Sequence, residues 1–281
     1  MVRWRGWTPL VRGPGPGPEP PGIQTSGEGP VAERLSGISA FFPCYNDAGS
    51  IEEMVRRADT VLPAVADRYD ITVVDDGSSD NSVAVLEGLR SEIPALSIVR
   101  HKRNRGYGGA LRSGFEAATK EFVFYTDGDG QYDPRELPKL VALMTESVGL
   151  VNGYKMNRAD AFYRTITGGT YEWMARRFFG IRIRDVDCDF RLIRTEYLRR
   201  VPLTFESGAI GLELVYNLQA AGCRMRETPV HHYPRLHGRS EFFSLKHVTD
   251  LITDVARFWW HTRRRGAARV PSSEFRVPSG S

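Results

Sequence analysis

The chain has 281 residues, of which 26% are charged, and its formal net charge is +4. So small an excess of positive charge does not indicate a nucleic-acid-binding protein. The three cysteines are too few and too far apart for a disulfide framework or a zinc site, which favours a reducing compartment. No apolar run approaches the roughly 18–20 residues that a membrane span needs.

Two stretches rich in Pro and Gly bound the part of the chain that we expect to fold. Residues 1–36 contain a run, Gly13 to Gly22, that cannot propagate a helix or a sheet ladder, and residues 266–281 are similar. We predict disordered tails at both ends. Between them we predict a catalytic domain over residues 37–240 and an amphipathic helix over residues 241–265.

Apolar strands and periodic helices alternate in the first half of this domain. The patterns predict strands over residues 38–42, 71–74, 96–99, 121–126 and 148–151, and helices that start near residues 50, 82, 107 and 134. Ser50 and Glu53 have the spacing of a capping box at the first helix. This order predicts a mostly parallel, Rossmann-like α/β sheet with right-handed crossovers and helices on both faces.

The second half of the chain is less regular. We predict a helix over residues 160–179, a strand over residues 187–193, and a helix over residues 208–221 that Gly222 ends. The last helix has an apolar stripe and a basic end, Arg263 to Arg265. Such a helix lies either at a membrane interface or against the domain.

The most informative motif is a pair of acids, Asp127 and Asp129, that directly follows the apolar strand over residues 121–126. Ligands of open α/β sheets bind outside the carboxyl ends of the strands, where these acids are expected. Two carboxylates separated by Gly128, with Gln131 beside them, can hold a hard divalent cation and let a diphosphate approach the backbone. The same residues are also typical of a polar turn, so the motif alone leaves both interpretations open.

Three further loops follow strands at the same predicted edge of the sheet. They are Pro43 to Asp47, Asp75 to Asp80, and Asn104 to Gly109. Each loop alone is typical of a turn, but together with the acidic pair they line the edge at which a nucleotide would bind.

In order and spacing, these loops resemble those of the family 2 glycosyltransferases, which have the GT-A fold. A narrower resemblance, to the dolichol-phosphate mannose synthase group of polyprenyl-phosphate sugar synthases, rests on Gln131 and two later stretches, Asp185 to Arg191 and Arg235 to Ser240. The resemblance covers about residues 37–265. Asp47 departs from the family pattern, in which Glu is usual at this position.

The resemblance implies a site for a nucleotide-sugar donor and a divalent metal ion, Mg²⁺ or Mn²⁺, that offsets charge on the leaving nucleotide diphosphate. The implied metal ligands are Asp127, Asp129 and Gln131. The implied residues of the whole donor site are Pro43, Tyr45, Asp47, Val74, Asp75, Asp76, Asp127, Gly128, Asp129 and Gln131. The implied catalytic residues are Asp127, Asp129, Arg164, Arg191 and Arg239.

Arginine gathers on the predicted acceptor side, since residues 158–200 contain ten Arg and no Lys. Arg presents a planar fork to phosphate, so we expect Arg164, Arg191 and Arg239 to face phosphate groups, although charge runs are usually solvated surface. Two departures from the family pattern, Gly168 in place of a small hydroxyl residue and Asp189 in place of Gly, favour a changed acceptor pocket.

The resemblance implies a hexosyltransferase that moves one hexose, mannose or glucose, from a nucleotide-diphosphate sugar to a polyprenyl or dolichyl phosphate. Such an acceptor is largely dianionic near neutral pH, so direct displacement at the anomeric carbon needs orientation more than a base and inverts configuration. Glu213 either orients a sugar hydroxyl or is a helix-surface acid.

Two alternatives stay open. One is a family 2 glycosyltransferase with a soluble or secondary-metabolite acceptor, and the other is a non-catalytic nucleotide-sugar binding protein. In each case we expect a cytoplasmic protein without a nucleic-acid partner. For the polyprenyl phosphate acceptor we also expect the last helix to contact the cytoplasmic face of a membrane.

Overall fold

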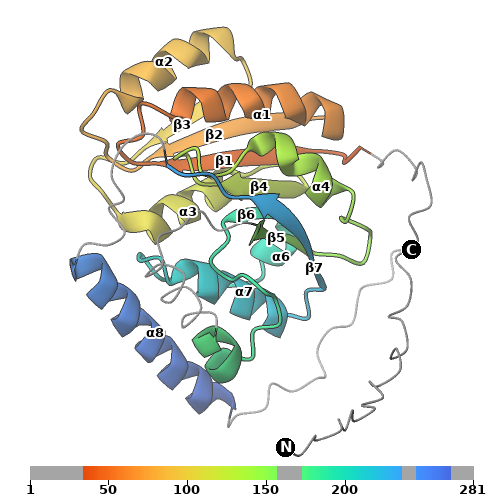
Figure 1. Cartoon of the computed structure of the whole chain (residues 1–281), viewed down its shortest axis with the longest axis vertical. Coiled ribbons are helices and arrows are strands. Elements are labelled where there is room, and N and C mark those ends of the chain that lie inside the picture. Colours follow the sequence, from red (N-terminus) through yellow and green to blue (C-terminus); the bar gives the residue numbers. More distant parts are fainter. Residues whose placement is uncertain (1–33, 157–172, 236–244, 267–281) are drawn as a thin grey trace, which may run out of the picture. The chain divides into compact units, whose positions relative to one another are not determined.

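The computed structural model describes residues 34–156, 173–235 and 245–266, with part of the side chains in the last stretch. The strands are β1 (Ile38–Cys44), β2 (Tyr69–Asp75), β3 (Leu96–Arg100), β4 (Phe122–Thr126), β5 (Leu150–Met156), β6 (Phe190–Arg194) and β7 (Met225–His231). Among the described residues these seven strands form one sheet in the order β3-β2-β1-β4-β6-β5-β7 (Figure 1). Its neighbouring strands run parallel except at β6, so the predicted mostly parallel α/β sheet is confirmed.

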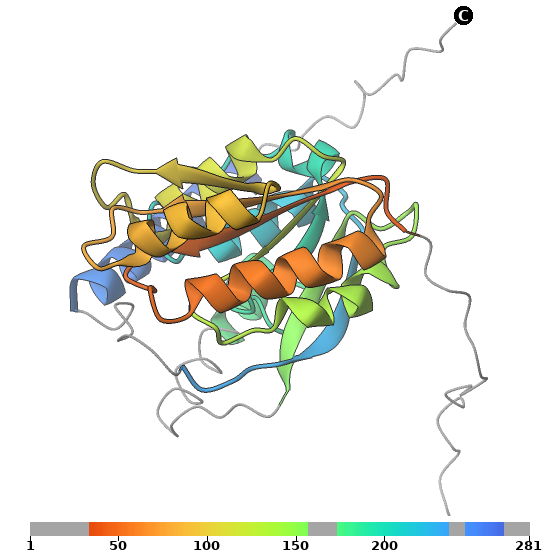
Figure 2. The ribbon, with the colours of Figure 1, turned by 90° about the horizontal axis from the view of Figure 1, so that it is seen from above.

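Helices cover both faces of the sheet, as predicted. One face carries α1 (Ile51–Val65), α2 (Ser82–Glu92), the short 3₁₀ turn η1 (Pro134–Glu136) and α4 (Leu137–Val141). The other face carries α3 (Gly106–Ala117), α6 (Thr195–Leu198) and α7 (Ile210–Ala220). Figure 2 shows α1 and α2 side by side over the first of these faces.

The strand β1 illustrates why the sequence folds into these layers. All seven of its residues are buried, because both faces of a central parallel strand are covered by helices. Phe42 packs into the apolar core beneath α1 and α2, whereas Phe41 points to the other face and stacks on Tyr125 with ring centroids 5.3 Å apart. Burial of one such side chain contributes about 1.5–3 kcal/mol.

The structure corrects the sequence prediction in the second half of the sheet. The strand predicted over residues 148–151 runs from Leu150 to Met156 and does not neighbour β4, because β6 lies between them and is antiparallel to both. The strand β7 was not predicted. It is an edge strand with alternating exposed positions, and it contains Pro229, which lacks the N–H of a ladder bond and is tolerated at an edge.

The capping-box prediction at α1 is wrong. Ser50 stands at the start of the helix, but its hydroxyl donates to the carbonyl oxygens of Gly128 at 2.9 Å and Asp47 at 3.3 Å. Glu53 pairs instead with Arg57 on the helix surface. The side chain of Ser50 therefore fastens the acidic loop after β4 to the loop after β1.

The last helix, α8 (Leu245–Gly266), packs on the domain along one side. Val255 is buried against α7 and a helical segment over residues 173–179, and Ser207 donates to Asp254 at 2.7 Å. Ile252 and Trp260 are instead 63% and 53% exposed, so the apolar stripe is divided between a packed side and an open side. None of the described helices is long and apolar enough to cross a membrane.

Parts of several predictions fall outside the described residues. The predicted tails lie almost wholly there, as do residues 160–172 of the predicted helix over 160–179 and residues 241–244 of the last helix. The proposed boundaries between the tails, the domain and the last helix stay predictions.

Candidate active site

Hydrogen bonds join the loops that follow β1, β2 and β4 at one edge of the sheet. The backbone N–H of Asp76 donates to the carbonyl oxygen of Cys44 at 2.9 Å, and that of Gly128 donates to Pro43 at 3.1 Å. These bonds extend the parallel pairing of β1 with its two neighbours past the ends of the strands. The loops predicted to line one sheet edge are therefore held side by side.

Gly128 is required by this close approach. A Cβ atom at position 128 would lie 2.7 Å from the carbonyl oxygen of Pro43 and 2.9 Å from the Cδ1 atom of Ile51. Backbone cannot yield to such a contact without breaking the bond between the two loops. The glycine between the two acids thus lets their loop seat directly on the end of β1.

Two carboxylates from two loops lie at one guanidinium group, and a third carboxylate, that of Asp127, lies near them. Arg235, in the segment that follows β7, forms an ion pair with Asp47, and its Nη1 atom lies 3.9 Å from the Oδ2 atom of Asp129. Asp127 accepts a hydrogen bond at 2.6 Å from the hydroxyl of Tyr107. The sequence patterns identified the acids but not the position of Arg235 among them.

Burial raises the pKa of Asp127 well above its ordinary value, and the charges of Asp189 and Asp129 raise it further. Burial also raises the pKa values of Asp129 and Asp47, an effect that the charge of Arg235 opposes. Burial and repulsion between neighbouring carboxylates therefore disfavour the charged forms of these groups, which a cation bound among them would stabilise. A site of this kind favours a bound cation.

The residues at this edge fit a hard divalent cation. Carboxylate oxygens of Asp127 and Asp129 lie in one loop, and the side-chain N–H of Gln131 donates to the carbonyl oxygen of Tyr233 at 3.2 Å, which leaves its amide oxygen as an acceptor. In the part of the chain that the structure describes, no three His, Cys, Asp or Glu side chains are already grouped as metal ligands. A metal would thus take two carboxylates, with the remaining ligands from Gln131, substrate oxygens or water.

The other predicted donor-site residues lie close by. Tyr45 is half-buried, and its backbone N–H donates to Asp47 at 3.2 Å. Asp75 is buried and accepts a hydrogen bond from the backbone N–H of Ser78 at 3.2 Å. Val74 is fully buried within β2, one position before this acid.

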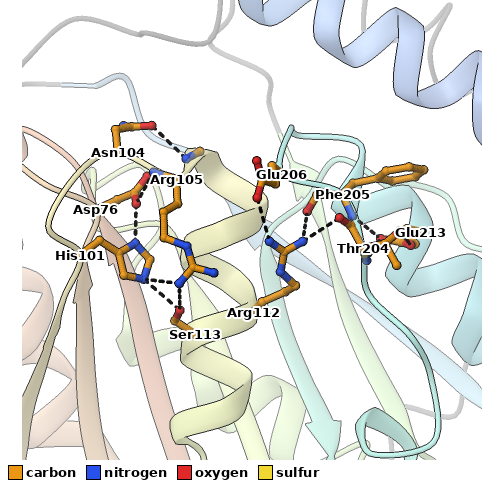
Figure 3. Close-up of polar contacts among 11 residues, drawn as sticks. Asp76, His101, Asn104, Arg105, Arg112, Ser113, Thr204, Phe205, Glu206 and Glu213 are labelled. Carbon is orange, nitrogen blue, oxygen red and sulfur yellow. Dashed lines mark hydrogen bonds and ion pairs between the residues drawn. The ribbon is translucent and has the colours of Figure 1, made fainter.

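His101 is a residue of the site that the sequence patterns did not identify. Its Nδ1 atom lies 2.5 Å from Asp76 and its Nε2 atom lies 2.9 Å from the hydroxyl of Ser113 on α3 (Figure 3). The backbone N–H of Arg105 donates to the same Asp76 oxygen at 2.9 Å. Two donors on one oxygen fix the carboxylate, and its other oxygen keeps its acceptor capacity for a ligand.

Arg191 does not lie where the phosphate prediction expected it. Its side chain is fully buried, and its guanidinium donates to Asn152 at 2.7 Å, to the carbonyl oxygen of Val186 at 2.6 Å and to the hydroxyl of Tyr125. A direct contact with a phosphate would require these bonds to be exchanged. Arg164 and Arg239 lie outside the described residues.

Glu213 is neither a surface acid nor open to a sugar. It is buried, and its carboxylate accepts hydrogen bonds from the backbone N–H of Thr204 at 2.8 Å and of Phe205 at 3.1 Å. From the other side, Arg112 on α3 donates to the carbonyl oxygens of the same two residues at 2.7 and 3.0 Å (Figure 3). Glu213 and Arg112 therefore anchor the loop that packs against the start of α3.

The fold and this site define a glycosyltransferase of the GT-A fold. Residues 39–201 match the family model described as glycosyl transferase family 2, and because the match covers more than half of the chain, the chain belongs to this family.

Two of the solved structures that are similar to the chain contain Mn²⁺ and a nucleotide or nucleotide sugar. Glucosyl-3-phosphoglycerate synthase from Mycobacterium tuberculosis, in complex with Mn²⁺, UDP and glucosyl-3-phosphoglycerate, has a TM-score of 0.60 and 17% identity over 79% of this chain and 80% of its own. A mannosyltransferase from Pyrobaculum calidifontis, in complex with GDP-Man and Mn²⁺, has a TM-score of 0.58 and 21% identity over 84% and 68%. Likeness at these identities establishes the fold alone.

Proposed function

We propose that the chain is a metal-dependent, inverting hexosyltransferase that moves one mannose or glucose unit from a nucleotide-diphosphate sugar to a polyprenyl phosphate. The observation that carries the proposal is the gathering of Asp47, Asp127 and Asp129 at the carboxyl ends of β1 and β4. The ligands of the two similar structures support it, since both contain Mn²⁺ and a nucleotide or nucleotide sugar.

Each part of the donor has a candidate partner in this chain. The flat side chain of Tyr45 and the carboxylate of Asp76 are suited to the base and ribose. The bound Mg²⁺ or Mn²⁺ supplies Lewis-acid stabilisation of the leaving nucleotide diphosphate. Asp129, Asp127 and Gln131 would hold the ion, and the loop around Gly128, which Ser50 fastens, keeps these side chains in position before substrate arrives.

The acceptor part of the proposal is supported by an exposed surface on α8 and the segment over residues 173–179. Trp173 and Phe178 are 60% and 46% exposed, and their rings lie 5.9 Å apart. The ring centroids of Phe178 and Trp259 lie 6.1 Å apart, and the guanidinium of Arg263 lies 4.4 Å from the ring centroid of Trp259. We call these residues, with the exposed Trp260 on α8, the aromatic–arginine surface.

Exposed aromatic rings mixed with arginine are suited to the interface of an anionic bilayer, where a polyprenyl phosphate presents its head group. The expected test is flotation with vesicles that contain anionic phospholipid. Replacing Trp173 and Trp260 by Ser should weaken binding about tenfold, and vesicles of neutral phosphatidylcholine should bind the wild-type chain less. Equal binding of the wild-type chain and the double variant would contradict the membrane contact.

A second candidate function has one observation in its favour. Arg191 is already occupied by protein groups, and the half-buried carboxylate of Asp189 lies beside it, so this part of the site favours a neutral hydroxyl acceptor over a phosphate. Under this alternative the enzyme transfers the hexose to a hydroxyl group of a soluble acceptor, and the similar mycobacterial synthase is solved in complex with a soluble hydroxy acid, phosphoglyceric acid.

Transfer of a radiolabelled hexose separates the candidates. Purified chain is incubated with Mn²⁺, labelled GDP-mannose or UDP-glucose, and polyprenyl phosphate in detergent, and the products are partitioned between organic and aqueous phases. Label in the organic phase supports the leading proposal, and label in an aqueous product formed with a soluble acceptor supports the second. Donor binding without transfer to any acceptor would indicate a non-catalytic binding protein.

A further inference from the structure

An acid of the second half of the chain lies next to the acidic pair. The antiparallel pairing of β4 with β6 ends with Thr126 opposite Phe190. One step beyond the ladder, the same register sets Asp127 opposite Asp189, and side chains directly opposite one another project to the same side of a sheet. Asp189 therefore lies at the carboxyl end of β4 although 62 positions separate it from Asp127.

The carboxylate of Asp189 is held in one orientation. Its Oδ1 atom accepts a hydrogen bond from the hydroxyl of Tyr125 at 3.1 Å and lies 3.2 Å from the Nη1 atom of Arg191. Arg191 is itself fixed by Asn152 and Val186. Both contacts fall on one oxygen, and 15% of the side-chain surface is exposed, so the carboxylate keeps acceptor capacity for a further donor even with the interaction of Tyr107.

Asp189 also shares its surroundings with the acid of the metal site. The charge of Asp189 is, after burial, the largest cause that raises the pKa of Asp127, and the hydroxyl of Tyr107 interacts with both acids. A purely structural partner for Arg191 has no need to face the donor site. The exposed part of this side chain can reach a polar group of a bound substrate.

We infer that Asp189 accepts a hydrogen bond from a hydroxyl group of the substrate beside Asp127, and so helps to determine which sugar or acceptor is used. The inference rests on the proposed hexosyl transfer. A carboxylate oriented by Arg191 and Tyr125 is suited to hydroxyl donors and repels phosphate. A site built to bond a hydroxyl discriminates strongly against an analogue that lacks it, because its polar group is then left without a partner.

The test compares donor binding by the wild-type chain and the Asp189→Asn variant, with Mn²⁺ and without acceptor. The probes are GDP-mannose and UDP-glucose, the matching nucleotides GDP and UDP, and donors with one hydroxyl removed at a time. We expect Asp189→Asn to weaken binding of the intact donor about 10- to 100-fold while binding of the free nucleotide changes less than about twofold. The variant should also lose discrimination against one deoxy donor and keep it against the others.

Two further variants separate this role from a structural one. Asp189→Glu keeps a negative charge for Arg191 but moves the carboxylate by one methylene, so it should preserve thermal stability and still lose discrimination. Asp187→Asn, an exposed acid two positions earlier that pairs with Lys155 at 3.0 Å, should leave discrimination unchanged. Should Asp189→Asn unfold, the Asp189→Glu comparison alone decides the result.

The source of the hydroxyl follows from the same measurements. Loss of donor discrimination assigns the hydroxyl to the hexose. The hydroxyl is assigned to the acceptor if Asp189→Asn binds the donor as the wild-type chain does and has a raised KM for a hydroxyl acceptor. In that case the KM for the deoxy analogue of the acceptor should not change. If both variants keep the discrimination of the wild-type chain on both sides, the inference is wrong. If the wild-type chain binds neither donor while it remains folded, the proposed function fails and this inference fails with it.

Discussion

Arg235 pairs with the carboxylate of Asp47, although the two residues are 188 positions apart in the chain. Its guanidinium also lies 3.9 Å from Asp129. The segment after β7 therefore carries a positive charge to the place where the acids of β1 and β4 meet. The same segment is fastened there by a backbone hydrogen bond from Tyr233 to Gln131 at 2.8 Å.

This ion pair predicts how the metal-free protein responds to loss of Arg235. In the Arg235→Gln variant, Asp47 and Asp129 lose the cation that offsets their repulsion, so the free energy of unfolding should fall by about 1–3 kcal/mol. Added Mn²⁺ should then raise the melting temperature of the variant more than that of the wild-type chain. Thermal unfolding in EDTA and in Mn²⁺ measures both effects, and Arg235→Lys is the matched control. Equal metal-induced shifts in wild type and Arg235→Gln would contradict the electrostatic role.

A second prediction concerns pH and follows from the raised pKa of Asp127. An acid whose pKa is higher in the folded state than its ordinary value of about 3.9 retains its proton on folding, so stability falls as pH rises through that window. The Asp127→Asn variant lacks this loss. As pH rises from about 4 to 7, the melting temperature of the variant, measured without metal, should therefore increase relative to that of the wild-type chain.

Comparison of the two proteins at each pH cancels the titration of the shared groups that do not interact with Asp127. Asp133, whose pKa is lowered mainly by Arg135 against the effect of burial, changes stability in the opposite direction and does so equally in both proteins. If the variant instead loses stability relative to wild type as pH rises, the surroundings of Asp127 do not raise its pKa.

The third prediction tests His101 as a positioning residue for Asp76. In His101→Phe the carboxylate loses one of two donors on the same oxygen, so the affinity for UDP or GDP should fall about tenfold. Ser113→Ala removes the contact behind the imidazole and a contact with Arg105 at 3.4 Å but keeps the imidazole, so it should change affinity less than about threefold. Calorimetric titration of the nucleotide measures both variants. His101→Phe with wild-type affinity would exclude this role.

The fourth prediction concerns the contact between α3 and the anchored loop. A Cβ atom at Gly108 would lie 2.1 Å from the carbonyl oxygen of Phe205, and the backbone N–H of Gly108 donates to Glu206 at 2.8 Å. Gly108→Ala should therefore destabilise the protein by about 2–4 kcal/mol in denaturant unfolding. Gly88 on α2 has no atom within 4 Å of its Cβ position, so Gly88→Ala should instead stabilise by about 0.5–1 kcal/mol. Similar effects of both substitutions would contradict the close packing.

The sequence was most informative where strands are buried on both faces. The runs that became β1, β2 and β4 are mostly apolar and buried, so these strands, and the loops that carry the acids at their ends, could be predicted. The strand β7 escaped prediction because an edge strand has one partner and tolerates Pro229. The position of Arg235, in the segment after β7, could not be predicted either, since its pairing with Asp47 depends on the path of the chain after that strand.

Burial explains the remaining differences at the site. Arg191 has the residue type that binds phosphate, but whether its guanidinium is free depends on Asn152 and Val186, which only the folded sheet brings to it. Glu213 likewise has the residue type of a sugar ligand and is used by the loop at Thr204. Residue type predicts which chemistry a side chain can perform, and its hydrogen-bond partners decide which one it performs.

Binding of nucleotide sugar with and without metal tests the central claim most directly. Isothermal titration of GDP-mannose and UDP-glucose into the wild-type chain should give a binding signal with Mn²⁺ or Mg²⁺ that EDTA abolishes. The Asp129→Asn variant should remain folded by circular dichroism, fail to bind in Mn²⁺ and show no sugar transfer, because it lacks a carboxylate that holds the ion. Metal-independent binding, or wild-type affinity and transfer in Asp129→Asn, would contradict the account.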